Sequence, residues 1–343
     1  MENQIQTPHK RRVRYKGKYP KKFEEKYKEL QPEKYKDTIE HVIQKGNTPA
    51  GMHISIMVKE IIDFLNIQPG EIGFDATLGY GGHTKAMLKC LNGKGHIYAT
   101  DVDPEESDKT KKRLADQGFG EDLLTVKLQN FCTIDEIAKE VGGFDFILAD
   151  LGVSSMQIDN PKRGFSFKVD GPLDLRLNQE AGISAAERLD TITRDELAGM
   201  LYENSDEPYC EELAKAITDE IRKGNRIDTT TKLRQVIEKT LDFLPEKEKK
   251  DTIKKTCQRT FQALRIDVNR EFEVLYEFME KLPDALRPGG RVAILTFHSG
   301  EDKLVKKALK EGYKAGIYSD YAKDVIRPSA QECAQNGRAR STK

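Results

Sequence analysis

The sequence predicts an α/β protein in which a Rossmann-like parallel sheet is interrupted by a helical insertion. From residue 72 onward, short apolar runs alternate with segments of helical periodicity, which is typical of a parallel sheet with right-handed crossovers. The alternation stops after residue 150 and resumes only near the C-terminal end of the sequence. A glycine-rich turn follows the first apolar run and marks the sheet edge at which ligands of such folds bind.

The first half of the chain contains the first predicted strands and the helices between them. Each strand is a short apolar run bounded by turn residues. A helix is expected before the first strand, within 53–67, because apolar residues recur there at helical spacing. The predicted strands cover 72–76, 96–100, 123–128 and 144–149, and the helices between them lie near 82–91, 104–117 and 133–141.

Residues 158–255 are predicted to form a helical insertion between two strands of one sheet. Within it, Ser184 and Thr193 are each followed three residues later by a glutamate, the capping-box pattern that marks the start of a helix. The remaining predicted elements are helices over 208–222, 230–243 and near 268–286, an exposed turn or helix end at 245–255, and a strand over 291–297.

The charge distribution separates a basic arm, residues 1–50, from the rest of the chain. Residues 1–22 hold eight lysines and arginines against one acidic residue, although the whole chain has a formal net charge of zero. Such arms commonly bind polyphosphate backbones, and a solvated tail is the alternative.

Several classes of protein are disfavoured by composition. No apolar run reaches the roughly 18 residues of a membrane span, and no apolar segment of a secretion signal follows the basic N-terminus. The five cysteines lie far apart without a C-x-x-C pair, which argues against a disulfide framework and against zinc. We therefore expect a cytoplasmic protein with no metal and no membrane partner. The oligomeric state stays open, a homodimer included.

The stretch Asp75–His83 together with Asp101 indicates a nucleoside-binding crevice. The glycine turn Gly79–Gly82 removes side chains where a ligand must approach the backbone. Asp101, at the carboxyl end of the next strand, could accept hydrogen bonds from both hydroxyls of a ribose. A dinucleotide fingerprint counted from Gly79 would need a glycine where Thr84 stands, which disfavours an NAD-dependent dehydrogenase. A nucleoside without phosphates, such as S-adenosylmethionine, fits better.

Several stretches of the chain resemble the bacterial 16S ribosomal RNA (cytosine-N4)-methyltransferase family, often called RsmH or MraW. They follow the family's order from about residue 53 to 341. The loop RGFSFKVDGPLDLRLN (163–178) is the most diagnostic, because generic methyltransferases lack it. The other matching stretches are DATLGYGGHT (75–84), ILADLGVSSMQID (147–159), RTFQALRIDVN (259–269), PGGRVAILTFHSGED (288–302) and RPSAQECAQNGRARS (327–341).

The resemblance implies a class I S-adenosylmethionine-dependent methyltransferase fold with S-adenosylmethionine as cofactor and 16S ribosomal RNA, in the small ribosomal subunit, as partner. Residues 51–157 and 256–343 would form the methyltransferase domain, and 158–255 would recognise the substrate. The family's cofactor contacts fall on Gly81, Gly82, His83, Asp101, Phe131, Asp150 and Gln157.

Asp150 is the candidate catalytic residue, because the fourth strand ends there and the target amine should meet the methyl donor at that point. Cytosine N4 is a poor nucleophile, since its lone pair is delocalised into the ring. Direct attack on the methyl group then needs alignment and an acceptor for the amine proton. Asp150 could instead contact the ammonium of the donor. No covalent cysteine is required, and Cys132, the nearest one, is expected only to pack.

A loop and one histidine are the candidate substrate-binding residues. Arg163, Phe165 and Phe167 form a basic and aromatic segment, and RNA recognition favours stacking of an unpaired base on an aromatic ring while arginines meet phosphates. The alternative is a loop packed internally by its own acidic residues and arginine. His298 follows the last strand and faces the same edge, where it could touch substrate or be purely structural.

We therefore expect methylation of cytosine N4 in the decoding region of 16S ribosomal RNA. The chain departs from the family pattern at Val102, Met156, 256–258 and Gly300. Two alternatives follow from these departures: a divergent paralogue that methylates a different RNA base, and a ribosome-binding protein without catalysis.

Overall fold

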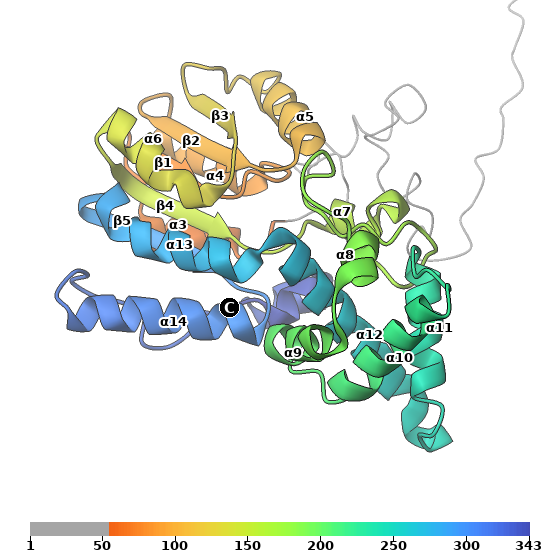
Figure 1. Cartoon of the computed structure of the whole chain (residues 1–343). Coiled ribbons are helices and arrows are strands. Elements are labelled where there is room, and N and C mark those ends of the chain that lie inside the picture. Colours follow the sequence, from red (N-terminus) through yellow and green to blue (C-terminus); the bar gives the residue numbers. More distant parts are fainter. Residues whose placement is uncertain (1–54) are drawn as a thin grey trace, which may run out of the picture. The chain divides into compact units, whose positions relative to one another are not determined.

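A parallel sheet with strand order β3-β2-β1-β4-β5 forms the centre of the part of the chain that the computed structural model describes, residues 55–343 (Figure 1). Every neighbouring pair in this sheet runs parallel, so the carboxyl ends of the strands share one edge. The predicted α/β fold is confirmed, whereas the arm predicted over 1–50 lies outside the described residues. The strands are β1 (Ile72–Asp75), β2 (His96–Asp101), β3 (Leu124–Leu128), β4 (Phe144–Asp150) and β5 (Leu286–Leu295).

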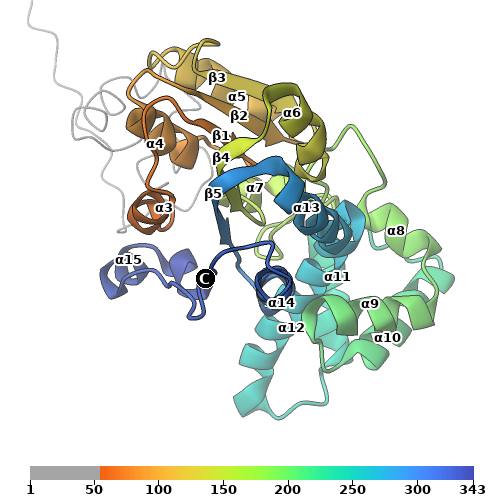
Figure 2. The ribbon, with the colours of Figure 1, turned by 90° about the vertical axis from the view of Figure 1, so that its left-hand side faces the viewer.

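Helices cover both faces of the sheet (Figure 2). Side chains of β4 alternate between the two resulting cores, with Phe146 and Leu148 in one and Ile147 and Ala149 in the other. The first core includes residues of α3 (Val58–Leu65), α4 (Gly82–Leu91) and α5 (Pro104–Ala115). The second includes residues of α6 (Ile134–Val141), α13 (Glu271–Ala285) and α14 (Ser299–Lys314).

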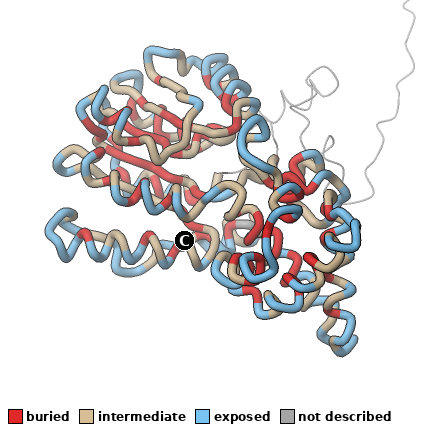
Figure 3. The backbone as a smooth tube through the Cα atoms, viewed as in Figure 1, coloured by how far each residue is buried: buried red, intermediate tan, exposed pale blue. Residues whose placement is uncertain are grey.

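The helical insertion has an apolar core of its own, separate from the two cores of the sheet (Figure 3). Both predicted capping boxes are confirmed: the hydroxyls of Ser184 and Thr193 accept from the N3 backbone, and the N3 glutamates bond back. The elements are α7 (Ser155–Asp159), η3 (Pro161–Arg163), α8 (Ala185–Thr191), α9 (Arg194–Ser205), α10 (Cys210–Arg222), α11 (Thr230–Thr240) and α12 (Glu246–Asn269).

Of the two alternatives predicted for 245–255, an exposed turn or a helix end, the helix end is confirmed, because these residues begin α12 at Glu246, and the helix runs on for 24 residues. Their lysines and glutamates are strong helix formers, and the second half of the helix is anchored by buried residues such as Phe261 and Leu264. The domain boundary drawn between 255 and 256 therefore falls inside one continuous helix. The next helix begins at Glu271 because Arg270 takes a left-handed conformation (φ 53°).

The last strand also begins earlier than the predicted residue 291. Leu286 already pairs with Phe144, and the register shifts before Arg291 pairs with Phe146. The proline and glycines between them therefore form an irregularity within β5. The strand ends at Leu295, so Thr296–His298 connect it to α14 at the ligand-binding edge of the sheet. No helix among residues 55–343 combines the length and the apolar character that crossing a bilayer requires.

A carboxylic acid lies in the insertion core without a close counter-charge. The side chain of Glu207 is 0% exposed, and the Nη1 atom of Arg259 lies 4.0 Å from its Oε2. Its Oε1 accepts hydrogen bonds from the backbone N–H of Tyr209 (3.1 Å) and the hydroxyl of Thr256 (3.2 Å), but Oε2 has no hydrogen-bond partner within the described part of the chain. Burial raises the pKa of Glu207 and outweighs the lowering by these neighbours.

Replacing Glu207 with Gln is expected to stabilise the protein at neutral pH. Because the pKa is raised in the folded state, the unfolded chain releases this proton first, and the free energy of unfolding falls as the pH rises above the ordinary glutamate value of 4.5. Urea denaturation should give the Gln variant a free energy of unfolding about 1 kcal/mol higher at pH 7, with the difference closing toward pH 4. A less stable Gln variant at pH 7 would show that the folded state favours the charge.

Candidate cofactor and substrate site

The carboxyl ends of β1, β2 and β4 bring Asp75, Asp101 and Asp150 to one edge of the sheet. Hydrogen bonds tie these ends together. The backbone N–H of Gly79, in the turn after β1, donates to Asp101 Oδ2 (2.8 Å), and that of Asp150 donates to the hydroxyl of Thr77 (2.8 Å). This edge is where ligands bind in folds of this kind.

The turn between β1 and α4 favours glycine at two positions, by backbone conformation at Gly81 and by the close approach of Ser55 at Gly82. Gly81 has φ 74°, and a Cβ there would lie 2.7 Å from Thr110 Cγ2. A Cβ on Gly82 would lie 1.9 Å from Ser55 Oγ. Gly81 is the N-cap of α4, and having no side chain it leaves this helix start without a side-chain cap from the N-cap position. Its first backbone N–H groups therefore provide a site suited to an anionic group.

His83 and Asp150 form a contact across this edge. His83 Nε2 lies 2.9 Å from the carbonyl oxygen of Ile56, so this nitrogen must carry a proton, and Nδ1 lies 3.3 Å from Asp150 Oδ2. Burial by itself lowers the pKa of His83, but the hydrogen bond and charge of Asp150 outweigh it and the pKa is raised. One carboxylate oxygen of Asp150 is thus engaged by the imidazole of His83. The other oxygen, Oδ1, is buried and has no hydrogen-bond partner among residues 55–343.

Asp101 is held in place by backbone donors on both carboxylate oxygens. Oδ2 accepts from Gly79 and Oδ1 accepts from the backbone N–H of Asp103 (2.9 Å). Burial raises the pKa of Asp101 to about 6, against the lowering by these N–H groups. Each oxygen keeps a lone pair for further donors, such as the hydroxyls of a ribose.

Asp75, in contrast to Asp101 and Asp150, uses both carboxylate oxygens to hold neighbouring residues in place. It is almost fully buried, its Oδ2 accepts from the hydroxyl of Thr84 (2.6 Å) and its Oδ1 from the backbone N–H of Thr77 (3.1 Å). Burial raises the pKa of Asp75 despite these bonds. Thr84, which breaks the dinucleotide fingerprint, therefore has a role in fixing the end of β1.

The groups at this edge fit the polar parts of S-adenosylmethionine. The uncapped N-terminus of α4 suits a carboxylate, Asp101 suits a ribose, and the unpartnered Oδ1 of Asp150 suits an ammonium or an amine. Phe131, the first residue of the 3₁₀-helix Phe131–Thr133 after β3, is only partly buried and packs edge-on against Phe278 at 5.2 Å between ring centroids. Its contact with adenine stays a prediction.

Two of the three loop residues predicted to meet RNA are buried. The Arg163 side chain is 6% exposed, and its guanidinium bonds to Asp103 Oδ2 (2.6 Å) and to backbone carbonyls of the same loop. Phe165 lies in the insertion core, and the partly buried Phe167 packs against Phe261. The structure thus corrects the expectation of an open basic and aromatic surface here, because the loop is packed internally.

Gln157 is engaged by protein groups as well. It completes a capping box with Ser154, since its Oε1 accepts from the Ser154 backbone N–H (2.9 Å). Its Nε2 donates to Asp103 Oδ2 (3.1 Å). Gln157 thus contacts Asp103, two residues after the proposed ribose ligand Asp101. Its direct contact with the cofactor stays a prediction.

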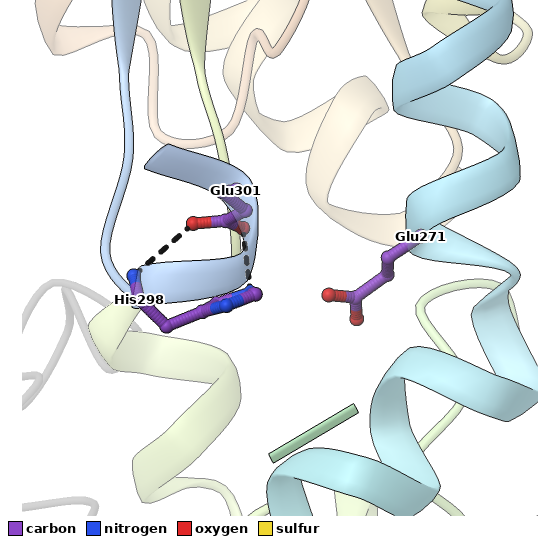
Figure 4. Close-up of side chains that lie close together, drawn as sticks. All are labelled: Glu271, His298 and Glu301. Atoms are coloured by element: carbon purple, nitrogen blue, oxygen red, sulfur yellow. Dashed lines mark hydrogen bonds and ion pairs between the residues drawn. The ribbon is translucent and has the colours of Figure 1, made fainter. Parts of the chain in front are cut away.

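His298 lies in a cluster with Glu271 and Glu301, whose side chains face one another in Figure 4. His298 Nε2 is 3.2 Å from Glu301 Oε1, and its backbone N–H donates to Glu301 Oε2 (3.3 Å). The ligand-type atoms of the three side chains lie within 4.8 Å of one another. Both oxygens of Glu271, however, accept from the guanidinium of Arg265 at 2.8 Å, so a positive charge is already present beside the cluster.

The departure at Gly300 has a packing explanation in this cluster. A Cβ at this position would lie 2.5 Å from the Phe272 ring, which packs edge-on against His298 at 5.7 Å between centroids. The phenylalanine thus fills the space that a larger residue at 300 would need. Contact between His298 and substrate stays a prediction.

Sequence reasoning missed Asp103 and Asn269. Asp103 caps α5, and the pair Asp103-Pro104 carries the usual signal of a helix start, an N-cap acid before proline. Asn269 ends α12 and bonds the 163–178 loop twice, through Leu177 N–H and the carbonyl oxygen of Leu175. No pattern along the chain marks the second role, because its partners are more than 90 residues away.

Comparison with known proteins gives consistent matches along the chain. Residues 50–343 match a family model described as the MraW methylase family. Ribosomal RNA small subunit methyltransferase H 1 of Agathobacter rectalis is 88% identical over 335 residues, 98% of this chain and 96% of that protein. The protein of the same name from Lachnoclostridium phytofermentans is 70% identical, covering 100% of this chain and 93% of its own length. Ribosomal RNA small subunit methyltransferase H 2 of Alkaliphilus metalliredigens is 62% identical, covering 97% and 95%.

Proposed function

The chain belongs to the MraW methylase family, and on this premise we propose that it methylates N4 of a cytosine in 16S ribosomal RNA, with S-adenosylmethionine as the methyl donor. The target lies in the decoding region of the small subunit, and the reaction takes place in the cytoplasm. The names of the relatives support ribosomal RNA of the small subunit as the substrate.

The observation that carries this proposal is the unpartnered carboxylate oxygen of Asp150 at the carboxyl end of β4. Burying an acceptor without a donor is costly, so the site is built for a group that brings an N–H. His83 holds the other oxygen and fixes the orientation of the carboxylate. The amine of cytosine and the ammonium of the cofactor are both donors of this kind.

Each residue of the site has a role in this proposal. S-adenosylmethionine, when bound, supplies an activated methyl group. The backbone at Gly81 and Gly82 binds its carboxylate, and Asp101 binds its ribose. Asp150 accepts a hydrogen bond from the target amine, which orients the lone pair and gives the departing proton an acceptor.

A covalent route through cysteine is disfavoured. Cys132 is the cysteine beside Phe131, and burial raises the pKa of its thiol, with the charge of Glu277 adding to the effect. The thiolate, which would be the nucleophile, is thereby suppressed. An exocyclic amine can attack directly, so the chemistry has no need of one.

The test is nucleoside mass spectrometry of small-subunit ribosomal RNA from cells with and without this gene. We expect N4-methylcytosine at one position to disappear on deletion and to return with the wild-type gene. Loss of a different methylated base would support the divergent-paralogue reading. Unchanged RNA, together with tight cofactor binding by the purified protein, would support a ribosome-binding protein without catalysis.

A further inference from the structure

Asp103 connects the cofactor loop, residues 101–103 after β2, to the 163–178 loop. Its backbone N–H donates to the carboxylate of Asp101, the residue proposed to hold the ribose. Its side chain caps α5 through Oδ1 (3.2 Å from the Glu106 backbone nitrogen) and accepts from Arg163 and Gln157 through Oδ2. One carboxylate therefore contacts the ribose-binding segment, a helix start and the first turns of the insertion.

The same helix also holds the glycine turn. The hydroxyl of Thr110, in α5, donates to the carbonyl oxygen of Gly79 (2.7 Å), and Arg113 Nη2 donates to that of Tyr80 (2.7 Å). Arg113 also lies over the ring of Tyr80, 3.6 Å from its centroid. A shift of the glycine turn, residues 79–82, would therefore move α5 and with it Asp103, the N-cap of that helix.

Arg163 bridges from Asp103 to the far side of its own loop. Its Nη1 bonds to Asp103, 60 residues away in sequence, while Nη2 donates to the carbonyl oxygens of Arg176 (3.0 Å) and Leu177 (2.6 Å). Leu175 beside them has φ 63°, a left-handed conformation that costs energy for a leucine. The guanidinium and Asn269 together hold this loop in that conformation.

The buried Asp103–Arg163 ion pair is poorly explained by a contribution to stability, because desolvation offsets much of its electrostatic attraction. Both side chains are nearly inaccessible, 4% and 6% exposed, so both charges pay for desolvation. An apolar pair of similar volume often stabilises as well or better. Removing one partner leaves the other charge buried and unpaired, which favours arrangements of the two segments in which Asp103 and Arg163 stay in contact.

We propose that Arg163 is a positioning residue that couples the two ligand sites: the Asp103–Arg163 pair transmits cofactor binding to the 163–178 loop, whose exposed middle, residues 168–170, is the part available to RNA. This inference rests on the proposed function for the identity of the ligands. Cofactor bound at Asp101 and the glycine turn fixes Asp103, and Asp103 fixes the 163–178 loop through Arg163. The cofactor and small-subunit RNA then bind more tightly together than either does alone, by the same factor in both directions.

The experiment measures that factor with S-adenosylhomocysteine, which occupies the site without transferring a methyl group. Affinity for purified small ribosomal subunits is measured with and without it, for the full chain. We expect a gain of about fivefold or more in the wild type, within the usual range of such couplings. Asp103→Asn should reduce the gain to about one, because asparagine caps a helix as well as aspartate but carries no charge.

Further variants separate coupling from stability. Arg163→Met should also abolish the gain, and Arg163→Lys should restore part of it, since lysine keeps the charge but not the planar fork. Arg188→Met is the control, because the Arg188–Asp267 pair (2.9 Å) lies in the insertion and does not contact the cofactor loop. It should lower stability and leave the gain intact. A gain of the same size in folded Asp103→Asn as in the wild type would overturn the proposal.

Hydrogen exchange provides a readout that needs no RNA. S-adenosylhomocysteine should slow amide exchange across 163–178 in the wild type, and only around 75–103 in Asp103→Asn. Absence of protection at 163–178 in the wild type would also overturn the proposal. Both measurements report binding, so they stand even if product analysis identifies a methylated base other than N4-methylcytosine.

Discussion

Replacing Asp150 with Asn is expected to lower the rate of methyl transfer by a factor of roughly 100 or more at saturating S-adenosylmethionine. The change keeps the shape of the side chain but removes its negative charge. The new NH₂ group also takes the place of one carboxylate oxygen, either Oδ1, which has no partner among the described residues, or Oδ2, which faces His83. The target amine then loses an acceptor for its proton. The rate is measured at saturating S-adenosylmethionine, so that any loss of contact between residue 150 and the ammonium of the cofactor does not lower it.

The matched control lies at the opposite end of the same strand. Asp145 accepts from the Ile72 backbone N–H and from Arg287, away from the ligand edge. Asp145→Asn should therefore lower stability and leave the rate of the folded enzyme within about twofold of the wild type. Affinity for small-subunit RNA should hardly change in either variant. A rate for Asp150→Asn within a few-fold of the wild type would remove Asp150 from the chemistry.

Replacing Asp101 with Ala is expected to weaken S-adenosylmethionine binding by a factor of about 10 to 100. A hydrogen bond to a charged group contributes about 1.5–3 kcal/mol, and each 1.4 kcal/mol corresponds to a factor of ten. Calorimetry of the purified protein measures the change directly. Asp108, which is exposed on α5, provides the control, because Asp108→Ala should bind the cofactor as the wild type does. Unchanged affinity in Asp101→Ala would show that Asp101 does not bind the ribose.

The pH dependence of the same binding follows from the pKa of Asp101, which burial raises to about 6. Ribose hydroxyls donate to the ionised carboxylate, so binding favours the deprotonated form. Wild-type affinity should therefore be constant above about pH 7 and fall below pH 6, by up to about tenfold for each pH unit. Asp101→Asn cannot ionise, and its affinity should stay flat over the same window.

Local patterns explain what could be predicted from the sequence. The strand ends at Asp75, Asp101 and Asp150 follow from short apolar runs, and the glycine turn follows from residues whose conformation or packing permits no side chain. The capping boxes at Ser184 and Thr193 could be predicted because both partners lie within one helical turn. In each case the atoms that interact are close neighbours along the chain.

The roles that could not be predicted depend on burial and on distant partners. Arg163 and Phe165 have the composition of an RNA-binding loop, but Asp103 and the insertion core bury them. Composition also left 245–255 open between an exposed turn and a helix end, and the continuation into buried residues of α12 decides for the helix. Neither a periodicity nor a motif records that Arg163 lies beside Asp103, 60 residues earlier.

The proposed reaction is tested most directly by its product in a purified system. Small ribosomal subunits from cells that lack this gene are incubated with the protein and S-adenosylmethionine that carries a deuterated methyl group. Their RNA is then digested to nucleosides for mass spectrometry. We predict deuterated N4-methylcytidine as the labelled product, with Asp150→Asn giving about a hundredth as much in the same time. Labelled 5-methylcytidine, or no labelled nucleoside from a protein that binds the cofactor tightly, would contradict direct transfer to the amine.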